Sequence, residues 1–364
     1  NSIDAGATRI SVDIDGGGVE RMRVSDNGRG VPFDEFELAF QRFATSKVTD
    51  SGDLDAIATL GFRGEALPSI AAVASVTLVS RSRGEESGAR LDIVEGVAGK
   101  KERQGASQGT TVSVRQLFRN VPARRKFLRS LATETSRINT LVTRYALAYP
   151  EIAFDLSVDG RPGFSSSGSR DLREVAAAVY KLQTAEAMIE LAPGGMGVEG
   201  EPSVGGLIGP PSHDRANRSY VSFFVNRRWV QNRVLGFAVE QAYHGFLMER
   251  RYPLAVVNVS VPHDEVDVNV HPAKAEVRFS KENQAFAAVQ RAVRGTLTEH
   301  SPVPEIAHTG YTHQTAAAPR PPAFWPTSPF GTGPYTKHEV SKCCLETINS
   351  IKKKLYLWPC FLKS

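Results

Sequence analysis

The sequence predicts an α+β fold. Apolar and polar residues alternate on both sides of Gly16-Gly17-Gly18, which is the pattern of two half-buried strands joined by a tight turn. Residues 131–148 instead carry apolar residues at helical spacing over a long stretch. Helical and strand patterns are mixed along the chain without strict β–α–β alternation. This order favours two α+β sandwiches over a doubly wound parallel sheet.

In the first 149 residues the expected elements follow one another irregularly. Asn1–Ala5 has the character of a helix end, closed by Gly6. The hairpin comes next, with Ile10, Val12 and Ile14 on one strand and Val19–Val24 as the other. The remaining elements are expected as a helix at Phe33–Phe43, a mobile loop at Ala44–Leu60, a helix at Glu65–Ala74, strands at Val76–Ser80, Ala89–Val94 and Thr110–Val114, and a helix at Leu131–Ala148.

Pro150 marks an expected boundary between a first domain, residues 1–149, and a second, residues 150–300. The second is expected to hold a strand at Ile152–Val158, a helix at Asp171–Leu182, a Gly-rich loop at Pro193–Pro202, a strand at Tyr220–Val225, a helix at Val234–Tyr243, strands at Ala255–Val261 and Glu276–Phe279, and a helix at Asn283–Leu297. Prolines crowd residues 301–336, which predicts a disordered linker. Residues 337–364 have no convincing period and form an unassigned tail.

Charge and cysteine content narrow the function classes. The net charge is +5, and residues 301–364 supply +4 of it through seven Lys or Arg against three Glu, leaving +1 for residues 1–300. Bulk charge is therefore a weak argument for nucleic acid, and DNA contacts must come from local basic clusters. All three cysteines lie in the tail, so residues 1–300 have no disulfide framework, cysteine nucleophile or thiolate zinc site.

The sequence predicts neither a membrane-spanning segment nor an N-terminal secretory signal. No apolar run reaches the roughly 20 residues that span a bilayer, and no basic stretch leads into an apolar core at the N-terminus. The chain begins with Asn1 rather than Met, so we expect a fragment of a longer protein.

Five short motifs lie in order along the first domain. They are Asn1-Ser2-Ile3-Asp4-Ala5, Asp26-Asn27-Gly28-Arg29-Gly30, Ala44-Thr45-Ser46-Lys47, Gly61-Phe62-Arg63-Gly64-Glu65-Ala66-Leu67 and Gly109-Thr110-Thr111. Each is weak alone, since the second is typical of a tight surface hairpin and the fourth of an ordinary loop and helix start. Together, in this order and spacing, they indicate a nucleotide site.

The chemistry of these residues fits an adenine base. A carboxylate at a strand end, such as Asp26, can accept from the exocyclic amine of adenine but does not match a guanine carbonyl at the same place. Gly28 and Gly30 allow the backbone to approach a base closely because no Cβ stands in the way.

Other residues suit the phosphates and their metal. Glycines flank Arg63, and the loop leads into a helix at Glu65, which offers backbone N–H donors and a positive dipole end. Lys47 adds a point charge. Asn1 provides an amide oxygen of the kind that Mg²⁺ accepts as one of few protein ligands.

These motifs resemble those of the GHKL ATPases, the class that includes DNA gyrase B subunits, heat-shock chaperones and histidine kinases. The strings NSIDAGAT, DNGRG, ATSK and GFRGEAL are similar to the MutL family in particular, and the resemblance extends to about residue 279. It implies a GHKL/Bergerat-type sandwich, a mixed sheet with helices on one face, followed by a ribosomal-protein-like βαββα transducer domain.

The resemblance also implies ATP and Mg²⁺ as cofactors. Asn1 would be the metal ligand, Asp26 would bind adenine, and Thr110 would support both Asp26 and the base through water. Ala44–Leu67 would form a lid over the phosphates. The ATP-binding set implied is Asp26, Asn27, Gly28, Gly30, Thr45, Ser46, Lys47, Gly61, Phe62, Arg63, Gly64, Glu65, Ala66, Leu67, Thr110 and Lys274.

One residue that the family uses has no counterpart here. In the family a general-base Glu lies one helical turn before the position of Asn1, which places it upstream of residue 1. A general base must be within hydrogen-bond reach of its proton, and nothing in the chain obviously replaces it, since Glu65 caps the lid helix in this pattern. We expect the full-length protein to hydrolyse ATP, and this fragment, without a catalytic residue of its own, to do so poorly or not at all.

A basic segment follows the first domain's last strand. Leu117–Leu128, spelled LFRNVPARRKFL, is a basic loop with two apolar anchors, and its spelling is particular to the MutL family. Pro122 fixes a turn, and Phe127 with Leu128 is suited to docking into the core. Arg124 and Arg125 are candidates for contact with a neighbouring domain, nucleotide-linked elements or DNA phosphates, and the sequence does not decide among these.

The string VNVHPAK, residues 268–274, ends in Lys274 of the second domain. Val266–Val270 alternates as a strand that Pro272 ends. His271 is interpreted as a hydrogen-bonded loop residue, because no second His or carboxylate has metal-ligand spacing. The resemblance implies that Lys274 reaches back to the γ-phosphate, which would make the angle between the domains depend on ATP versus ADP.

A second basic cluster lies between an expected strand and helix. Arg227, Arg228 and Arg233 are spaced with Asn and Gln, as in a phosphate-contacting groove, although a solvated turn is an equal alternative. The family resemblance, which implies DNA contacts in this domain, favours the first. Such contacts would be salt-sensitive and largely independent of sequence.

The function hypothesis is an ATP-dependent molecular clamp in DNA mismatch repair, cytoplasmic and nucleoid-associated. The resemblance implies as partners mismatched DNA, a MutS-type mismatch sensor, a strand-nicking endonuclease or helicase, and a second copy of the protein, joined through the ATP-bound N-terminal halves and a C-terminal domain. Alternatives are an ATP-binding scaffold without turnover and a type II topoisomerase-like ATPase subunit, whose transducer lysine sits in a Gln-Thr-Lys context not found here. A histidine kinase is disfavoured because no phospho-acceptor helix precedes the first domain.

Overall fold

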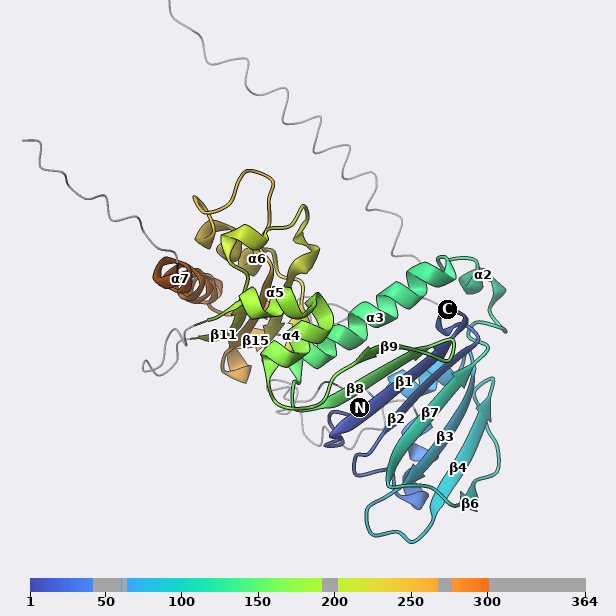
Figure 1. Cartoon of the computed structure of the whole chain (residues 1–364). Coiled ribbons are helices and arrows are strands. Elements are labelled where there is room, and N and C mark those ends of the chain that lie inside the picture. The colour runs from blue at the N-terminus through green and yellow to red at the C-terminus, as the bar shows by residue number, and fades with distance from the viewer. Residues whose placement is uncertain (42–59, 61–63, 192–201, 268–276, 301–364) are drawn as a thin grey trace, which may run out of the picture. The chain divides into compact units, whose positions relative to one another are not determined.

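A computed structural model describes residues 1–41, 60, 64–191, 202–267 and 277–300. The described residues belong to one compact unit (Figure 1). The expected linker, residues 301–336, and the tail, residues 337–364, lie outside the described residues, as do the expected loop at 44–59 and nearly all of the loop at 193–202. None of the helices in the described ranges has both the length and the apolar character needed to cross a membrane.

The first sheet is mixed. Within the described residues it has nine strands in the order β5-β4-β3-β7-β2-β1-β8-β9, with β6 beside β4. Neighbouring strands are antiparallel except β1 and β8, which are parallel. The bounds are β1 (Arg9–Asp15), β2 (Arg21–Asp26), β3 (Ser75–Arg81), β4 (Gly88–Val94), β5 (Val97–Ala98), β6 (Glu102–Gln104), β7 (Gly109–Arg115), β8 (Ala153–Val158) and β9 (Arg161–Ser165).

Helices cover one face of this sheet. The strand register puts Ile14, Met22 and Val114 in one row, so their side chains share a face. Apolar side chains of α3 (Leu131–Ala148) pack on that face at one end, and those of α1 (Ala66–Ala71) pack on it at the other. The predicted α+β sandwich, a mixed sheet with helices on one face, is confirmed.

The expected helix at Phe33–Phe43 is wrong in its described part. Two short 3₁₀ turns, Phe33–Glu35 and Leu38–Phe40, take its place, and Gln41 has extended backbone angles that end the second. Phe36 is fully buried against the first sheet. Packing of this aromatic side chain in the core therefore overrides the helical spacing of the segment.

The second sheet has α6 and α7 on one face, and on the other it packs against side chains of α3, α4 and α5. In the described residues its order is β10-β11-β14-β12-β13, and β15 pairs with β16 separately. Its elements are α4 (Leu172–Tyr180), α5 (Leu182–Ala187), β10 (Ile189–Glu190), β11 (Ser203–Ile208), β12 (Val221–Val225), β13 (Arg228–Val230), α6 (Arg233–Ala242), β14 (Ala255–Ser260), β15 (Val266–Asp267), β16 (Arg278–Phe279) and α7 (Glu282–His300). The expected single helix at Asp171–Leu182 is divided because Lys181 has a φ of 77°.

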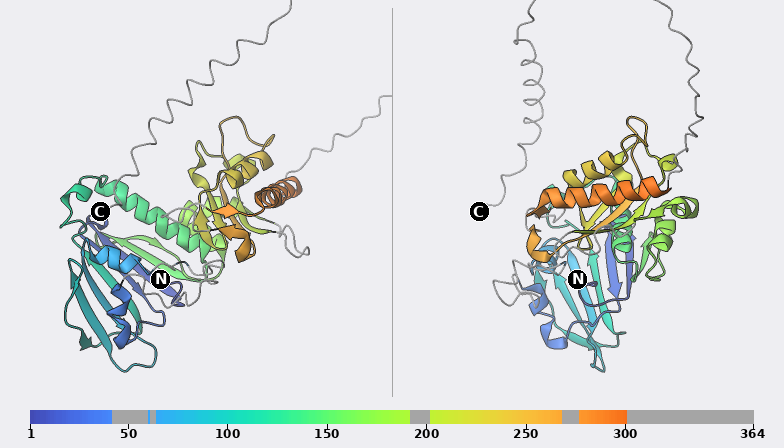
Figure 2. Two further views of the ribbon diagram at one scale, coloured as in Figure 1. Left: turned by 180° about the vertical axis from the view of Figure 1, so that it is seen from behind. Right: turned by 90° about the vertical axis from the view of Figure 1, so that its left-hand side faces the viewer.

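Residues 1–149 and residues 150–300, called here the first and second halves of the chain, share a hydrophobic core. Successive residues of β12 point to opposite faces, so Phe223 packs toward α6 and α7 while Phe224 packs toward α3. Phe224 joins Ile10 of the first sheet and Val142 of α3 in one cluster. The left view of Figure 2 shows α3 running from the first sheet to the second half. The division at Pro150 stays a prediction, and the first sheet itself extends past Pro150 through β8 and β9.

Candidate functional site

A row of polar side chains interrupts the apolar face of the first sheet. On β2, β7 and β3 that face carries Met22 and Val24, Val114 and Val112, and Val76 and Leu78. The next position on these strands is Asp26, Thr110 and Ser80, which are in register with one another. Three adjacent polar groups on a core-facing surface are costly unless they are hydrogen-bonded, so this end of the face is where a polar ligand fits.

In the part of the chain that the structure describes, the Asp26 carboxylate is held by three donors. Ser2 Oγ donates to Asp26 Oδ2 at 2.7 Å, and the backbone N–H groups of Gly28 and Thr110 donate to Oδ1 at 2.9 and 3.3 Å. An ionised carboxylate has about four acceptor positions. With respect to the described residues, one position on Oδ2 is therefore left for a further donor, and a donor is what the amine of adenine presents.

The loop after Asp26 is fixed by two glycines and by hydrogen bonds from backbone N–H groups to the Asn27 side chain. Asn27 Oδ1 accepts the N–H groups of Thr8 and Arg9, both at 2.9 Å. A Cβ on Gly28 would lie 3.0 Å from Ala5 Cβ and 3.1 Å from Asp26 Oδ1. Gly30 has a φ of 77°, and a Cβ there would lie 2.2 Å from the Arg81 carbonyl oxygen. Both glycines permit close approach of other parts of the protein, and their predicted approach to a base stays a prediction.

Asn1–Ala5 forms a single turn beside this loop. The N–H of Ala5 donates to the Asn1 carbonyl oxygen at 2.9 Å, and the Ala5 carbonyl accepts from Arg29 N at 3.0 Å. The residue that the sequence predicts as a metal ligand, Asn1, therefore lies on the same turn as Ser2, which contacts Asp26. Asn1 has a side-chain amide oxygen, which is a hard ligand of the kind that Mg²⁺ takes.

Other predicted nucleotide contacts are only partly described. Gly64 has a φ of 60° and precedes α1, which Glu65, Ala66 and Leu67 begin, and α1 packs beside β3. Of the residues that the sequence analysis names, the following lie outside the described ranges: Thr45, Ser46, Lys47, Gly61, Phe62, Arg63, His271 and Lys274.

Two residues of the site were missed by the sequence analysis. Ser80 is buried, its Oγ accepts the N–H of Val31 at 2.8 Å, and it lies 3.0 Å from Thr110 Oγ1. A polar residue at an inward position of Val76–Ser80 was the available signal. Ser2 carried no such signal, because its contact with Asp26 joins segments 24 residues apart.

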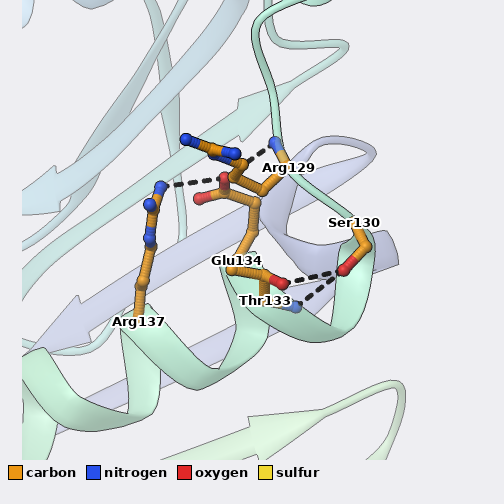
Figure 3. A network of polar contacts seen from close by, with 5 residues as sticks. All are labelled: Arg129, Ser130, Thr133, Glu134 and Arg137. Carbon is orange, nitrogen blue, oxygen red and sulfur yellow. Dashed lines mark hydrogen bonds and ion pairs between the residues drawn. The ribbon is translucent and has the colours of Figure 1, made fainter. Parts of the chain in front are cut away.

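The predicted basic segment at Leu117–Leu128 is exposed. Arg124 and Arg125 lie on α2 (Pro122–Arg125) and face solvent. The expected docking of Phe127 into the core is wrong, because its side chain is 84% exposed. The segment is tied to α3 instead: the N–H of Arg129 donates to Glu134 at 3.0 Å, and Ser130 caps the helix by accepting from Thr133 N (Figure 3).

The arginines of the second basic cluster differ in their surroundings. Arg227 bonds the Glu151 carboxylate and the Ala148 carbonyl and lies over the Tyr149 ring at 4.3 Å. Arg228 is only 9% exposed. Arg233 begins α6 and faces solvent. Arg227, whose side chain is 42% exposed, and Arg233 thus both have exposure for a phosphate contact, whereas a contact of DNA with Arg228 would compete with the interior of the protein.

Comparison with known proteins places these features in a family. A model described as "Histidine kinase-, DNA gyrase B-, and HSP90-like ATPase" matches residues 1–117, and one described as "DNA mismatch repair protein, C-terminal domain" matches residues 176–298. The DNA mismatch repair protein MutL of Desulforudis audaxviator is 43% identical over 304 residues, covering 84% of this chain and 53% of that protein. MutL of Limosilactobacillus reuteri is 40% identical over 306 residues, covering 84% and 45%.

The chain belongs to the MutL family. The crystal structure of the N-terminal domain of a DNA repair protein shares its fold, with a TM-score of 0.69 and 24% identity over 82% of this chain and 91% of that one. The Aquifex aeolicus MutL ATPase domain complexed with ADP matches with a TM-score of 0.52 and 28% identity over 72% and 88%. This MutL-family chain spans about half the length of the curated relatives it matches.

Proposed function

We propose that the described part of this MutL-family chain binds an adenine nucleotide at the row formed by Asp26, Thr110 and Ser80. The observation that carries the proposal is the remaining acceptor position of Asp26, whose other positions are filled by Ser2, Gly28 and Thr110. An acceptor selects the exocyclic amine of adenine and repels the carbonyl that guanine has at that position. The related Aquifex aeolicus domain complexed with ADP supports the same assignment.

Binding of ADP and GDP by the chain and by Asp26→Asn tests this proposal. A hydrogen bond to a charged group contributes about 1.5–3 kcal/mol, so we expect Asp26→Asn to weaken ADP binding by roughly 10- to 150-fold and to reduce the preference for ADP over GDP. Asp155→Asn is the matched control, because Asp155 lies on β8 of the same sheet and its Oδ1 accepts from Ser165. Equal ADP affinity in Asp26→Asn and Asp155→Asn would contradict the proposal.

Mg²⁺ is the metal that the site suits. The exposed side chain of Asn1 has a hard amide oxygen, and its turn carries Ser2 next to Asp26. When bound, the ion would neutralise the charge of the phosphates, and Asn1 would hold it with water completing its shell. Phosphate contacts by Thr45, Ser46, Lys47, Gly61, Phe62, Arg63 and Lys274, and a role for the start of α1 at Gly64–Leu67, are part of the same proposal.

For the whole protein we propose ATP-dependent DNA mismatch repair. ATP would drive association of two copies, and the closed form would link a MutS-type mismatch sensor to strand nicking or unwinding at the nucleoid in the cytoplasm. The supporting observations are the MutL relatives and the exposed Arg124, Arg125 and Arg233. A single-turnover ATPase measurement on the complete protein distinguishes hydrolysis, the expected result, from a nucleotide-responsive scaffold, which would bind ATP without releasing phosphate.

A further inference from the structure

A groove lies between α6 and α7, on the face of the second sheet that is turned away from α3. At one end of the helix pair the rings of Phe237 and Phe286 are 6.0 Å apart, and at the other Arg294 Nη1 donates to the Ala242 carbonyl oxygen at 3.1 Å. The two helices therefore run side by side in the same direction. The groove has a volume of about 520 Å³ and is lined by Gln241, His244, Gln290, Arg291, Arg294 and Gly295.

The side chains that line this groove favour a negatively charged ligand. Two arginines, a histidine and two glutamines contribute to the lining, and no carboxylate of the described residues does. Amide and guanidinium N–H groups are donors, so an oxyanion that enters the groove finds several hydrogen-bond partners. A cation would instead meet the charge of both arginines. The lining therefore selects for an anionic group.

Arg294 is held in position before any ligand binds. Its Nη1 donates to the carbonyl oxygens of Ala242 and His244 at 3.1 and 2.8 Å, at the end of α6. Its guanidinium also lies over the Phe246 ring, 4.5 Å from the centroid. Among the described residues no acceptor bonds its Nε or Nη2, so those donors remain for a ligand. An arginine that is already ordered loses little side-chain entropy when it binds a carboxylate.

Gly295 leaves the groove open in the middle of α7. A Cβ at this position would meet no described atom within 4 Å, so no packing contact excludes a larger residue. Glycine inside a helix is nevertheless less stable than alanine, because it loses more conformational freedom on folding. Packing within the chain does not account for a glycine here. Space for a side chain that enters from a partner does.

The two ends of the helix pair differ in polarity, which favours a protein segment as the occupant. Phe237 lies one turn before Gln241 on α6 and is 53% exposed. Arg291 and Arg294 lie one turn apart at the other end. A nucleic acid strand has a phosphate at every residue and is matched by cations along its whole path. A peptide needs an acidic residue only at one end and an apolar residue at the other, which is the pattern that these helices present.

We propose that the α6–α7 groove is a docking site for an acidic segment of a protein partner. An Asp or Glu side chain of the partner enters beside Gly295, where Arg291 and Arg294 bind its carboxylate. The groove glutamines bond the partner's backbone, and an apolar residue of the partner packs on Phe237. This surface belongs to the second half of the chain and involves none of the residues of the nucleotide row. It therefore goes beyond the proposed nucleotide function and does not rest on it.

Fluorescence anisotropy with a labelled peptide of glutamate and leucine tests the proposal, and a peptide of lysine and leucine is the control ligand. We expect the native chain to bind the glutamate peptide more tightly by roughly tenfold or more, and higher salt to weaken this binding. Arg291→Glu should weaken it by roughly tenfold or more, because an attraction becomes a repulsion.

Gly295→Leu tests the shape of the groove separately from its charge. Leucine favours a helix more than glycine does, but its side chain fills the groove, so we expect roughly fivefold weaker binding of the glutamate peptide or more. Gly236→Leu is the matched control: it lies on α6 outside the groove lining, and its added Cβ also meets no described atom within 4 Å. Gly236→Leu should bind the peptide as the native chain does.

Urea unfolding identifies the variants that fold, and Arg291→Glu carries the test if Gly295→Leu does not. Equal peptide affinity in folded Gly295→Leu and Gly236→Leu would overturn the proposal, as would a native chain that binds neither peptide or both equally. Oligothymidylate serves as a competitor. If it displaces the glutamate peptide and binds Gly295→Leu more weakly than Gly236→Leu, the groove is a nucleic-acid site and the proposal of a protein partner is wrong.

Discussion

Replacing Gly30 by Ala tests whether the loop after Asp26 needs a close backbone approach or only a left-handed conformation. The φ of Gly30 is 77°, which costs an L-residue about 1–2 kcal/mol. The added Cβ would also lie 2.2 Å from the Arg81 carbonyl oxygen, so the loop must move away from the end of β3. That movement strains the bonds from Arg83 N to Arg29 O, 2.9 Å, and from Val31 N to Ser80 Oγ, 2.8 Å.

Each of those hydrogen bonds contributes about 1 kcal/mol, so the expected destabilisation by Gly30→Ala is about 3–4 kcal/mol. Gly84→Ala is the control: its φ is 93°, but nothing lies within 4 Å of the added Cβ, so only the conformational cost of about 1–2 kcal/mol applies. Urea unfolding followed by circular dichroism measures both. Equal midpoints for Gly30→Ala and Gly84→Ala would refute the close-approach argument.

Three further outcomes are expected. Ser130→Ala removes the cap of α3 and should lower the free energy of unfolding by about 1 kcal/mol in urea titration. Arg227→Ala loses its partly exposed pair with Glu151 and should cost about 1 kcal/mol, an effect that 1 M salt reduces. Burial raises the pKa of Tyr243, whose hydroxyl donates to the Gly209 carbonyl oxygen. The neutral side chain therefore stabilises the fold fully below about pH 10, and this stabilisation is lost as the pH rises further. In Tyr243→Phe the free energy of unfolding should therefore fall less steeply above about pH 10 than in the native chain, and an equally steep fall would contradict this expectation.

Elements with one strong period could be predicted from the sequence. The helix at Leu131–Ala148 has the predicted bounds, and the strands around Ile10, Val76 and Thr110 lie where alternation put them. Elements without such a period were missed. β11 (Ser203–Ile208) contains two glycines and no alternation, and it is a strand because β14 pairs with it along its length. Its structure is fixed by a partner about fifty residues away, which no local pattern reports.

The candidate site was predictable where its chemistry is local. Asp26 and its glycines form a contiguous motif, and the Gly28 N–H donates to Asp26 Oδ1 at 2.9 Å. The contacts with a base that their residue types suggest stay predictions. Arg228 shows the opposite case. A run of arginines is typical of a solvated or DNA-facing surface, yet the strand period of β13 turns this one inward. Exposure depends on which face of β13 packs on α3, and the sequence of the cluster alone does not contain that information.

The position of the polar row explains why the second half of the chain can influence the first. Asp26 lies opposite Ile10 in the β1–β2 pair, and Ile10 belongs to the core that Phe224 of the second sheet completes. The row is therefore one strand away from side chains that both halves bury together. A packed core transmits small displacements because it has few voids to absorb them. A shift of the β12–β13 hairpin must then move α3, to which Arg227 and Trp229 join it.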